Sequence, residues 1–379
     1  MMKILWLTNI PSPYRVDFFN ELGKLCDLTV LFERAASAER DDSWKKFQTE
    51  NFKAVFLKGK KFGVAEAFCP SVRKYLKKHV YDHIVVTNFS DPTGMLAIAY
   101  MKRKRIPYAI ESDGAFAGSG RGVKERIKKY FLSGAELYFS TAEEHEKYYL
   151  TYGAPKGKLV RYPFSSLRDR DILCAPVSFD EKARLKKELG INEEKVILAV
   201  GQFIPRKGFD LLIQAMATLP KEIGCYIVGG KAPEEYWQLT KRLATSNVHF
   251  VDFKEKEELK KYYRAADVFV HPTREDIWGL VVNEAMAQGL PVVATDRCIA
   301  ALELVENGKN GYVIPTENVG ALKEKLATLL EDGDLRASMN EESLRAIRRY
   351  TVEEMAKFHM NIWLSSKEAH FWKEPTLKL

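Results

Sequence analysis

Short apolar runs alternate with amphipathic segments along most of the chain. Runs such as KILWLT and HIVVTN have consecutive apolar residues at their centres, which is typical of strands buried on both faces of a parallel sheet. The alternation of such runs with amphipathic segments predicts βαβ units and an α/β fold class. The first series places strands in KILWLT, DLTVLF, AVFL, HIVVTN, YAIES and LYFST, and helices at 16–24, 66–78, 92–102, 123–132 and 142–149.

A second series with the same alternation begins at KVILAVGQ. Before it, residues 161–192 hold two prolines, many charges and a single helical stretch, which is typical of a connection between domains. The length of 379 residues is also about twice the common domain size. We therefore predict two Rossmann-like doubly wound domains, at 1–170 and 195–350, with a linker region at 171–194. The second series places strands in KVILAVGQ, GCYIVGG, HFVDF, DVFVHP, PVVAT and GYVIP, and helices at 209–219, 233–244, 256–265 and before Gln288.

The last part of the chain, from Val319, is helical in pattern. Thr351 followed by Glu354 fits a capping box at the start of a terminal helix. The segment 351–379 carries more large apolar side chains than one small domain requires, so we expect it to pack back on the first domain. These side chains are Met355, Phe358, Met360, Trp363, Phe371 and Trp372.

Composition excludes several classes of protein. With 46% hydrophobic and 29% charged residues, the chain is neither disordered nor fibrous. Its longest apolar run falls well short of the roughly 18 residues that a membrane span needs, and its start is too short in apolar residues for a signal peptide. Five cysteines without a CxxC pair indicate neither a disulfide framework nor structural zinc. We expect a cytoplasmic protein.

The charge is distributed unevenly. Residues 1–170 hold 30 Lys and Arg against 19 Asp and Glu, and the remainder holds 29 against 32, so the two parts carry +11 and −3. Part of the excess lies at 102–105 and in the predicted helix 123–132, which is both basic and amphipathic. Such a half can contact an anionic membrane, a phosphorylated substrate or a nucleic acid, or it can simply be solvated.

The richest turn after a buried strand is HPTREDIWGLVVNEAMAQGLPVVAT, residues 271–295. Ligands of doubly wound sheets bind at the carboxyl ends of strands. Gly279 lets the backbone approach a ligand at a helix start, where the amides of Trp278, Gly279 and Leu280 can hold an anion or sugar hydroxyls. Glu284 points back to the same mouth, and its carboxylate suits the two vicinal hydroxyls of a ribose.

The string EDIWGLVVNEAMAQGLPVVAT resembles the signature of retaining glycosyltransferase family 4, in which two acidic residues are separated by seven others. The resemblance assigns the donor hexose to Asp276 and the ribose to Glu284. Asp276 departs from the Glu that is usual in the family, and its side chain is one methylene shorter. From spacing alone, the two acids fit equally well as a charge pair favoured by the helix dipole.

A second motif, VGQFIPRKGFDLLIQA, follows a buried strand and opens a helix, with Gly201 permitting tight backbone passage. It resembles the family's G-R-L-x-x-x-K-G segment, whose Arg and Lys grip the nucleotide diphosphate. Lys207 matches the Lys of that segment. Gln202 stands in place of the Arg, so Arg206 is expected to supply the missing charge. Without the resemblance, Arg206 and Lys207 fit better as solvated charges.

The resemblance covers nearly the whole chain and is least specific in the first domain. The segment that includes Phe253 resembles the lining of the base pocket. After YAIE, where the family often has a His near the acceptor, this chain has Asp113, which is either an acceptor-side residue or a turn former. Arg15 is a candidate for a phosphate contact or a helix cap. The YPFSSL segment resembles the connector of capsule and exopolysaccharide glycosyltransferases.

The resemblance implies a GT-B fold, with two domains that face each other across a cleft. It further implies retaining transfer of a hexosyl unit from a UDP- or GDP-sugar to a glycan or lipid-linked acceptor in bacterial capsule, exopolysaccharide, lipopolysaccharide or glycolipid synthesis. The expected catalytic residues are Asp276, Lys207 and Asp113. No cofactor is expected, and no metal, because both DxD triplets lie away from buried strands.

Two alternatives stay open. A nucleotide-sugar epimerase would have the same fold. A basic nucleic-acid-binding protein would account for the charge of the first half, but no recognition module is visible and the second half is acidic, so no nucleic-acid partner is expected. The protein is expected either free in the cytoplasm or peripheral at the inner face of the membrane.

Overall fold

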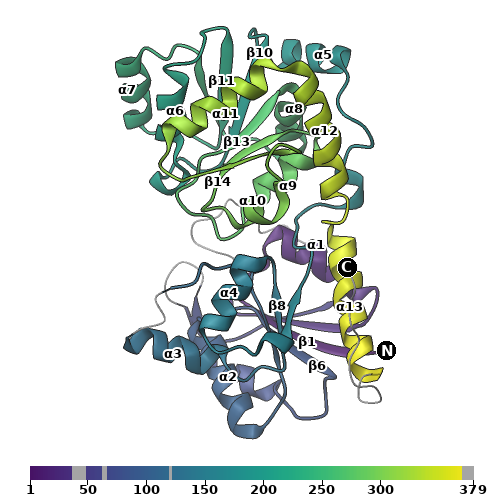
Figure 1. The fold of residues 1–379 in the computed structure, drawn as a ribbon. Helices are drawn as coiled ribbons and strands as arrows, with labels where there is room; N and C mark the ends of the chain where they lie inside the picture. Colours follow the sequence, from purple (N-terminus) through teal and green to yellow (C-terminus); the bar gives the residue numbers. More distant parts are fainter. Residues whose placement is uncertain (36–47, 62–65, 119–121, 369–379) are drawn as a thin grey trace. The chain divides into compact units, whose positions relative to one another are not determined.

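The computed structural model describes residues 1–35, 48–61, 66–118 and 122–368. The chain divides into two compact units, Met1–Ser166 with Tyr350–Leu379 (unit 1) and Leu167–Arg349 (unit 2). Each unit is built on a parallel sheet with helices packed against it (Figure 1). The prediction of an α/β fold with two Rossmann-like domains is confirmed.

Unit 1 contains a sheet of seven parallel strands in the order β3-β2-β1-β6-β7-β8-β9. The strands are β1 (Lys3–Thr8), β2 (Asp27–Phe32), β3 (Lys53–Phe56), β6 (His83–Val86), β7 (Ala109–Glu111), β8 (Leu137–Ser140) and β9 (Leu159–Arg161). The helices are α1 (Pro13–Gly23), α2 (Pro92–Lys104), α3 (Val123–Leu132), α4 (Glu143–Thr151) and α13 (Val352–Glu368), and a small hairpin pairs β4 (Lys60–Lys61) with β5 (Ala67–Phe68).

Side chains of β1 enter two different cores because successive residues of a strand point to opposite faces. Leu5 joins the apolar cluster beneath α2. Trp6 points the other way and contacts Trp363 of α13, with ring centroids 6.3 Å apart. The terminal helix α13, yellow in Figure 1, thus lies beside α1 in unit 1, as predicted. Phe371 and Trp372 lie outside the described residues.

The prediction of a helix at 66–78 was wrong. The segment contains β5 and a short 3-10 helix at Pro70–Lys74. The amide of Ala67 donates to the Glu33 carboxylate at 3.1 Å, and the amide of Cys69 donates to the Thr93 hydroxyl at 3.0 Å. Pairing of β5 with β4 keeps Ala67 and Phe68 extended, and side chains from distant parts of the sequence satisfy the amides of Ala67 and Cys69 outside a helix.

Unit 2 contains a sheet of six parallel strands in the order β12-β11-β10-β13-β14-β15, which is the doubly wound order 3-2-1-4-5-6. The strands are β10 (Lys195–Val200), β11 (Ile223–Val228), β12 (Val248–Val251), β13 (Val268–His271), β14 (Val292–Thr295) and β15 (Gly311–Ile314). The helices are α5 (Phe179–Leu189), α6 (Phe209–Met216), α7 (Glu234–Leu243), α8 (Lys256–Ala265), α9 (Leu280–Ala287), α10 (Ile299–Leu304), α11 (Val319–Glu331) and α12 (Gly333–Ile347).

The segment 171–194, expected as a linker, lies within unit 2. Its helix α5 packs against α8. The buried carboxylate of Asp171 accepts hydrogen bonds from Lys256 at 2.6 Å and Lys260 at 2.9 Å, both on α8. Charged residues and the helix of this segment are therefore packed within unit 2. Within the described residues, no helix is long and apolar enough to cross a membrane.

Candidate functional site in the second unit

In the unit 2 sheet, the strand order reverses between the neighbouring strands β10 and β13. Ligands of such sheets bind outside the carboxyl ends of the strands at this point. The two sequence motifs provide the loops at these ends, 201–208 and 272–279. The loops are joined at the carbonyl of Arg206, which accepts from the Arg274 amide at 2.7 Å and from the Thr273 hydroxyl at 2.9 Å. Motifs about 70 residues apart in sequence thus form one surface.

Lys207 and Asp276 of these loops form a compact network with His271, the last residue of β13. Lys207 Nζ lies 2.5 Å from Asp276 Oδ2, and His271 Nε2 lies 3.0 Å from the same oxygen. The three side chains are 13%, 12% and 0% exposed. His271 Nδ1 is buried and accepts no hydrogen bond from the described residues, which places the ring proton on Nε2, where it is donated to Asp276.

The network keeps a carboxylate charged inside the protein. Burial by itself would raise the pKa of Asp276, but the hydrogen bond from His271 and the charge of Lys207 outweigh it and hold this pKa well below its usual range. Burial lowers the pKa of His271, so its imidazole is neutral. Arg206 is half-exposed, and its guanidinium donates to the carbonyl of Glu275 at 2.6 Å. The mouth of the loops therefore presents positive charge.

Two glycines allow the loops to approach this closely. Gly208 has φ +68°, and a Cβ there would lie 2.0 Å from the carbonyl oxygen of Pro272. Gly279 has φ +104° and opens α9, and a Cβ there would lie 2.7 Å from the sulfur of Cys298. Trp278 is buried beneath this helix start. The amides of Gly279 and Leu280 begin the helix, where amides have no intrahelical acceptor.

The other predicted donor-side residues lie at the same edge of the sheet. Glu284, one turn into α9, accepts from the Tyr263 hydroxyl at 3.0 Å, and burial raises the pKa of its carboxyl group. Gly201 and Gln202 follow β10, and Gln202 is exposed. Phe253 follows β12 and is 59% exposed. The structure thus gathers the predicted set on the loops and helix starts after β10, β12 and β13.

Unit 1 holds the remaining predicted residue, Asp113, just after β7. Its Oδ2 accepts from the Tyr14 hydroxyl at 2.5 Å, and its Oδ1 pairs with Arg15. Arg15 is 4% exposed and also pairs with the fully buried Glu111, which accepts from His359 of α13 at 2.8 Å. Arg15 therefore neither caps a helix nor stands open to a phosphate, because two carboxylates already bind its guanidinium.

A histidine reaches the same edge from another element. His145 of α4 places Nε2 2.8 Å from the Ser112 hydroxyl, next to Asp113, and its Nδ1 accepts from the Thr141 amide at 3.2 Å. Burial lowers the pKa of His145 to about 3, so the ring is neutral and donates from Nε2. The sequence after β7 lacks a His, and the fold supplies one from 33 residues further on.

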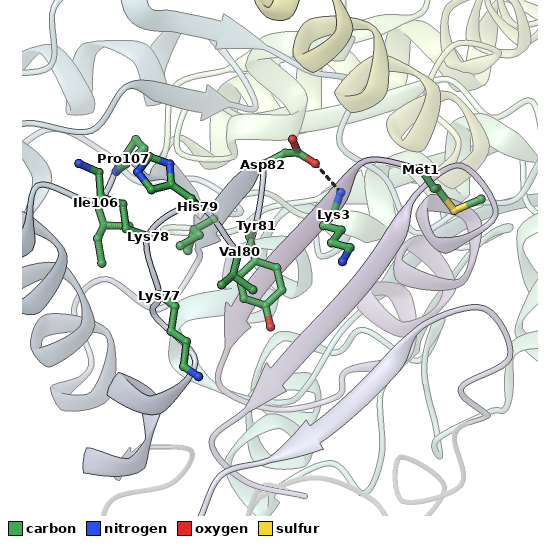
Figure 2. Close-up of a pocket in the computed structure, with 11 residues that line it drawn as sticks. Met1, Lys3, Lys77, Lys78, His79, Val80, Tyr81, Asp82, Ile106 and Pro107 are labelled. Carbon is green, nitrogen blue, oxygen red and sulfur yellow. Dashed lines mark hydrogen bonds between the residues drawn. The ribbon is translucent and has the colours of Figure 1, made fainter.

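A separate pocket of about 600 Å³ opens at the amino ends of β1 and β6, the opposite edge of the unit 1 sheet (Figure 2). The main-chain amide of Lys3 donates there to the Asp82 carboxylate at 2.8 Å. The pocket is basic, but it contains none of the motif residues. Its basic side chains are Lys3, Lys77, Lys78 and His79.

Sequence reasoning did not assign His271, Tyr263 or His359 to these networks. His271 had a usable signal, because it is the last residue of a buried strand that leads into the motif. Tyr263 and His359 had none, since each lies on a helix far along the chain from the carboxylate that it contacts.

Residues 181–345 match the family model described as glycosyl transferases group 1. The match includes both motif loops and the whole network of Lys207, Asp276 and His271. Most of unit 2 is thus similar to the group 1 glycosyltransferases. One curated protein similar to this part of the chain is D-inositol 3-phosphate glycosyltransferase of Corynebacterium glutamicum (strain R), 32% identical over 192 residues, which are 47% of this chain and 46% of that protein.

Another is the GDP-mannose-dependent alpha-(1-6)-phosphatidylinositol monomannoside mannosyltransferase of Mycolicibacterium smegmatis, 34% identical over 175 residues, 42% of this chain and 45% of that protein. The chain thus matches about half the length of these curated relatives. Among solved structures, Anabaena HepE in complex with UDP has 20% identity and a TM-score of 0.79 over 96% of this chain and 100% of that chain. This likeness shows the fold, which is GT-B with two Rossmann-like domains.

Proposed function

We propose that the chain is a retaining glycosyltransferase that moves a hexosyl unit from a nucleotide diphosphate sugar to an acceptor hydroxyl, without an obligatory metal, in bacterial surface polysaccharide or glycolipid synthesis. The network of Lys207 and Asp276 at the carboxyl edge of a group 1 domain carries this proposal. A UDP-sugar is the first donor to test, because a protein of the same fold was solved with UDP. The mannosyltransferase relative adds GDP-sugars to the candidates.

The proposed chemistry is stabilisation of a leaving group. As the bond between the anomeric carbon and the diphosphate oxygen breaks, negative charge grows on the diphosphate. Lys207, Arg206 and the amides of Gly279 and Leu280 are the groups assigned to stabilise it. The acceptor oxygen bonds to the anomeric carbon, and its proton passes to the departing diphosphate oxygen. No protein nucleophile is assigned.

Asp276 is assigned to hold Lys207 rather than to contact the hexose. Its carboxylate is 12% exposed and already binds Lys207 and His271. Because its side chain is shorter than the Glu usual in the family, it keeps the lysine ammonium close to the end of β13. Glu284 is assigned to the ribose hydroxyls, with Tyr263 fixing one carboxylate oxygen.

Thermal unfolding with UDP, GDP, ADP or dTDP tests the donor assignment. A nucleoside diphosphate at a hundredfold excess over its Kd should stabilise the parent by about 2.7 kcal/mol. Lys207→Ala should weaken that binding by about 1.5–3 kcal/mol, the value of a hydrogen bond to a charged group, and Glu284→Ala should weaken it too. Lys241→Ala, an exposed lysine of α7, is the matched control.

Failure of all four nucleotides to stabilise the parent, or full binding by Lys207→Ala, would contradict the donor assignment. With the donor identified, NMR of the first product formed gives the anomeric configuration. An inverted anomeric centre would rule out the retaining mechanism and leave the transferase assignment in place.

We also propose that α3 contacts an anionic membrane surface. Val123, Ile127 and Tyr130 are 72%, 48% and 52% exposed, and basic side chains such as Lys124 and Arg126 lie exposed among them. An apolar face rimmed with basic residues suits anionic headgroups. Ile127→Asp should reduce sedimentation with phosphatidylglycerol vesicles several-fold. Phe179→Asp, at an exposed apolar residue of α5, is the control, and equal loss in both variants would exclude α3 as the contact surface.

A further inference from the structure

The terminal helix α13 places an ionisable side chain in the aromatic core of unit 1. His359 is fully buried and stacks on Phe139, with ring centroids 4.3 Å apart. Phe18 and Tyr162 lie 5.2 Å and 5.0 Å from it, and Trp6 lies at 5.8 Å. A neutral apolar residue would fill such a site without the free-energy cost of burying a polar group, so the imidazole needs hydrogen-bond partners there.

Both ring nitrogens of His359 face acceptors. Nδ1 lies 2.8 Å from the carbonyl oxygen of Met355, and Nε2 lies 2.8 Å from Glu111 Oε2. Burial would raise the pKa of Glu111, but Arg15 and His359 outweigh it and lower this pKa, so Glu111 is a carboxylate. Two acceptors require two N–H donors, which makes His359 an imidazolium. The surrounding ring faces suit a cation.

From His359 a line of alternating charges runs outward to the carboxyl edge of the sheet. His359 binds Glu111, Glu111 binds Arg15, and Arg15 binds Asp113. Exposure rises along the line from 0% at His359 and Glu111 to 4% at Arg15 and 28% at Asp113. The two positive and two negative charges balance. Buried ion pairs of this kind contribute little net stability compared with apolar packing. Their main effect is therefore to fix the position of the Asp113 carboxylate.

We propose that Asp113 binds a hydroxyl group of an acceptor sugar, and that His359 and Glu111 are positioning residues that fix Asp113 through Arg15. Tyr14 and Arg15 each occupy one oxygen of Asp113, which has further lone pairs for a hydroxyl donor. This inference rests on the proposed function and deepens it. It gives the last helix of the chain a part in acceptor binding.

A double-mutant cycle tests the relay. The donor chosen by the nucleotide screen is used with methyl α-D-glucopyranoside and methyl α-D-mannopyranoside as acceptor probes. His359→Gln keeps one N–H donor but loses the positive charge, and it should raise the acceptor KM about tenfold with the donor KM unchanged. In the Asp113→Asn background, the same His359→Gln change should have little further effect, because the carboxylate that it positions is gone.

A structural role alone would give a different pattern. Met360→Ala removes packing from α13 without touching the charges and serves as the control for stability. If Met360→Ala raises the acceptor KM as much as His359→Gln, or if the effect of His359→Gln is the same with and without Asp113, the relay is overturned. If neither methyl glycoside increases the rate of donor turnover by the active parent enzyme, the assignment of Asp113 to a sugar hydroxyl is overturned.

The relay also has a spectroscopic readout. In protein labelled with 15N-histidine, both ring nitrogens of His359 should carry protons at neutral pH, with the signal assigned by its loss in His359→Gln. A neutral tautomer would overturn the alternating-charge relay. Donor hydrolysis in water is measured alongside, because it needs the donor site of unit 2 and no sugar acceptor. A failure of the relay leaves hydrolysis intact, whereas a failure of the proposed function abolishes it.

Discussion

Asp276 in unit 2 and Asp113 in unit 1 each lie at the carboxyl edge of a parallel sheet, and the two units support these carboxylates in different ways. In unit 2, the partners of Asp276 are the last residue of β13 and a lysine of the other motif loop, 5 and 69 residues away in sequence. In unit 1, Asp113 depends on Tyr14 and Arg15 from the first helix and, through Glu111, on the last helix.

The two networks differ in where the partners of each carboxylate lie in the sequence. At the end of β13 the local sequence supplies a histidine, and the motif loop after the neighbouring strand β10 supplies the lysine, so residues of the two motifs complete the network. At the end of β7 the local sequence supplies two carboxylates and no cation. The compensating charges must come from helices at both ends of unit 1, which makes that network wholly dependent on tertiary packing.

Removing the central cation of unit 1 should have the largest effect. Arg15→Met leaves the fully buried Glu111 without its guanidinium, and breaking a buried pair in this way costs about 3–5 kcal/mol. Chemical denaturation measures the loss. Arg15→Lys keeps the charge but not the fork that spans two carboxylates, so it should cost less. A loss below about 1 kcal/mol in Arg15→Met would contradict the dependence of the buried Glu111 on the guanidinium.

A pair of glycines tests how strongly unit 2 depends on close backbone approach. Gly208 and Gly190 have φ of +68° and +69°, but a Cβ meets Pro272 at 2.0 Å at the first and nothing within 4 Å at the second. Gly190→Ala should cost about 1–2 kcal/mol from the left-handed conformation alone. Gly208→Ala should cost roughly 1 kcal/mol or more beyond that and should weaken nucleotide binding. Equal losses in the free energy of unfolding of the two variants would mean that the loops can move apart to accommodate the added methyl group.

The smallest expected effect is a gain in stability. Burial raises the pKa of Glu284 above its ordinary 4.5, so its carboxyl group favours the folded state below pH 4.5 and loses that advantage as pH rises through the folded pKa. Glu284→Gln should therefore be slightly more stable than the parent at pH 7 without nucleotide, while binding nucleotide more weakly. Thermal unfolding between pH 4 and 8 measures both. A variant that is less stable at pH 7 would contradict the sign.

Glu111 should show the opposite pH dependence. Its pKa is lowered in the folded state, so its stabilisation is present above pH 4.5 and is lost as pH falls through the folded pKa. Comparison of Glu111→Gln with Glu284→Gln across the same pH range therefore distinguishes a buried carboxyl group whose pKa is lowered by charged partners from one whose pKa is raised by burial.

Most of the fold could be read from the pattern of apolar runs, because most of the parallel strands are buried and mainly apolar. The helix prediction at 66–78 was wrong because β5 pairs with β4 and because Glu33 and Thr93, distant in sequence, bind the amides of Ala67 and Cys69. The expected linker at 171–194 failed to stand apart because Asp171 and α5 find partners on α8. In both cases long-range contacts overrode local composition.

The sequence by itself determined the two α/β units and the motif residues Lys207, Asp276 and Glu284, since strand periodicity and motif spacing are local properties. Only the tertiary structure decided that Asp276 binds Lys207 and His271, and that Asp113 is tied through Arg15 and Glu111 to His359. Those pairings depend on which side chains meet when distant helices pack, and the energy of a buried charge depends on the partners that it then finds.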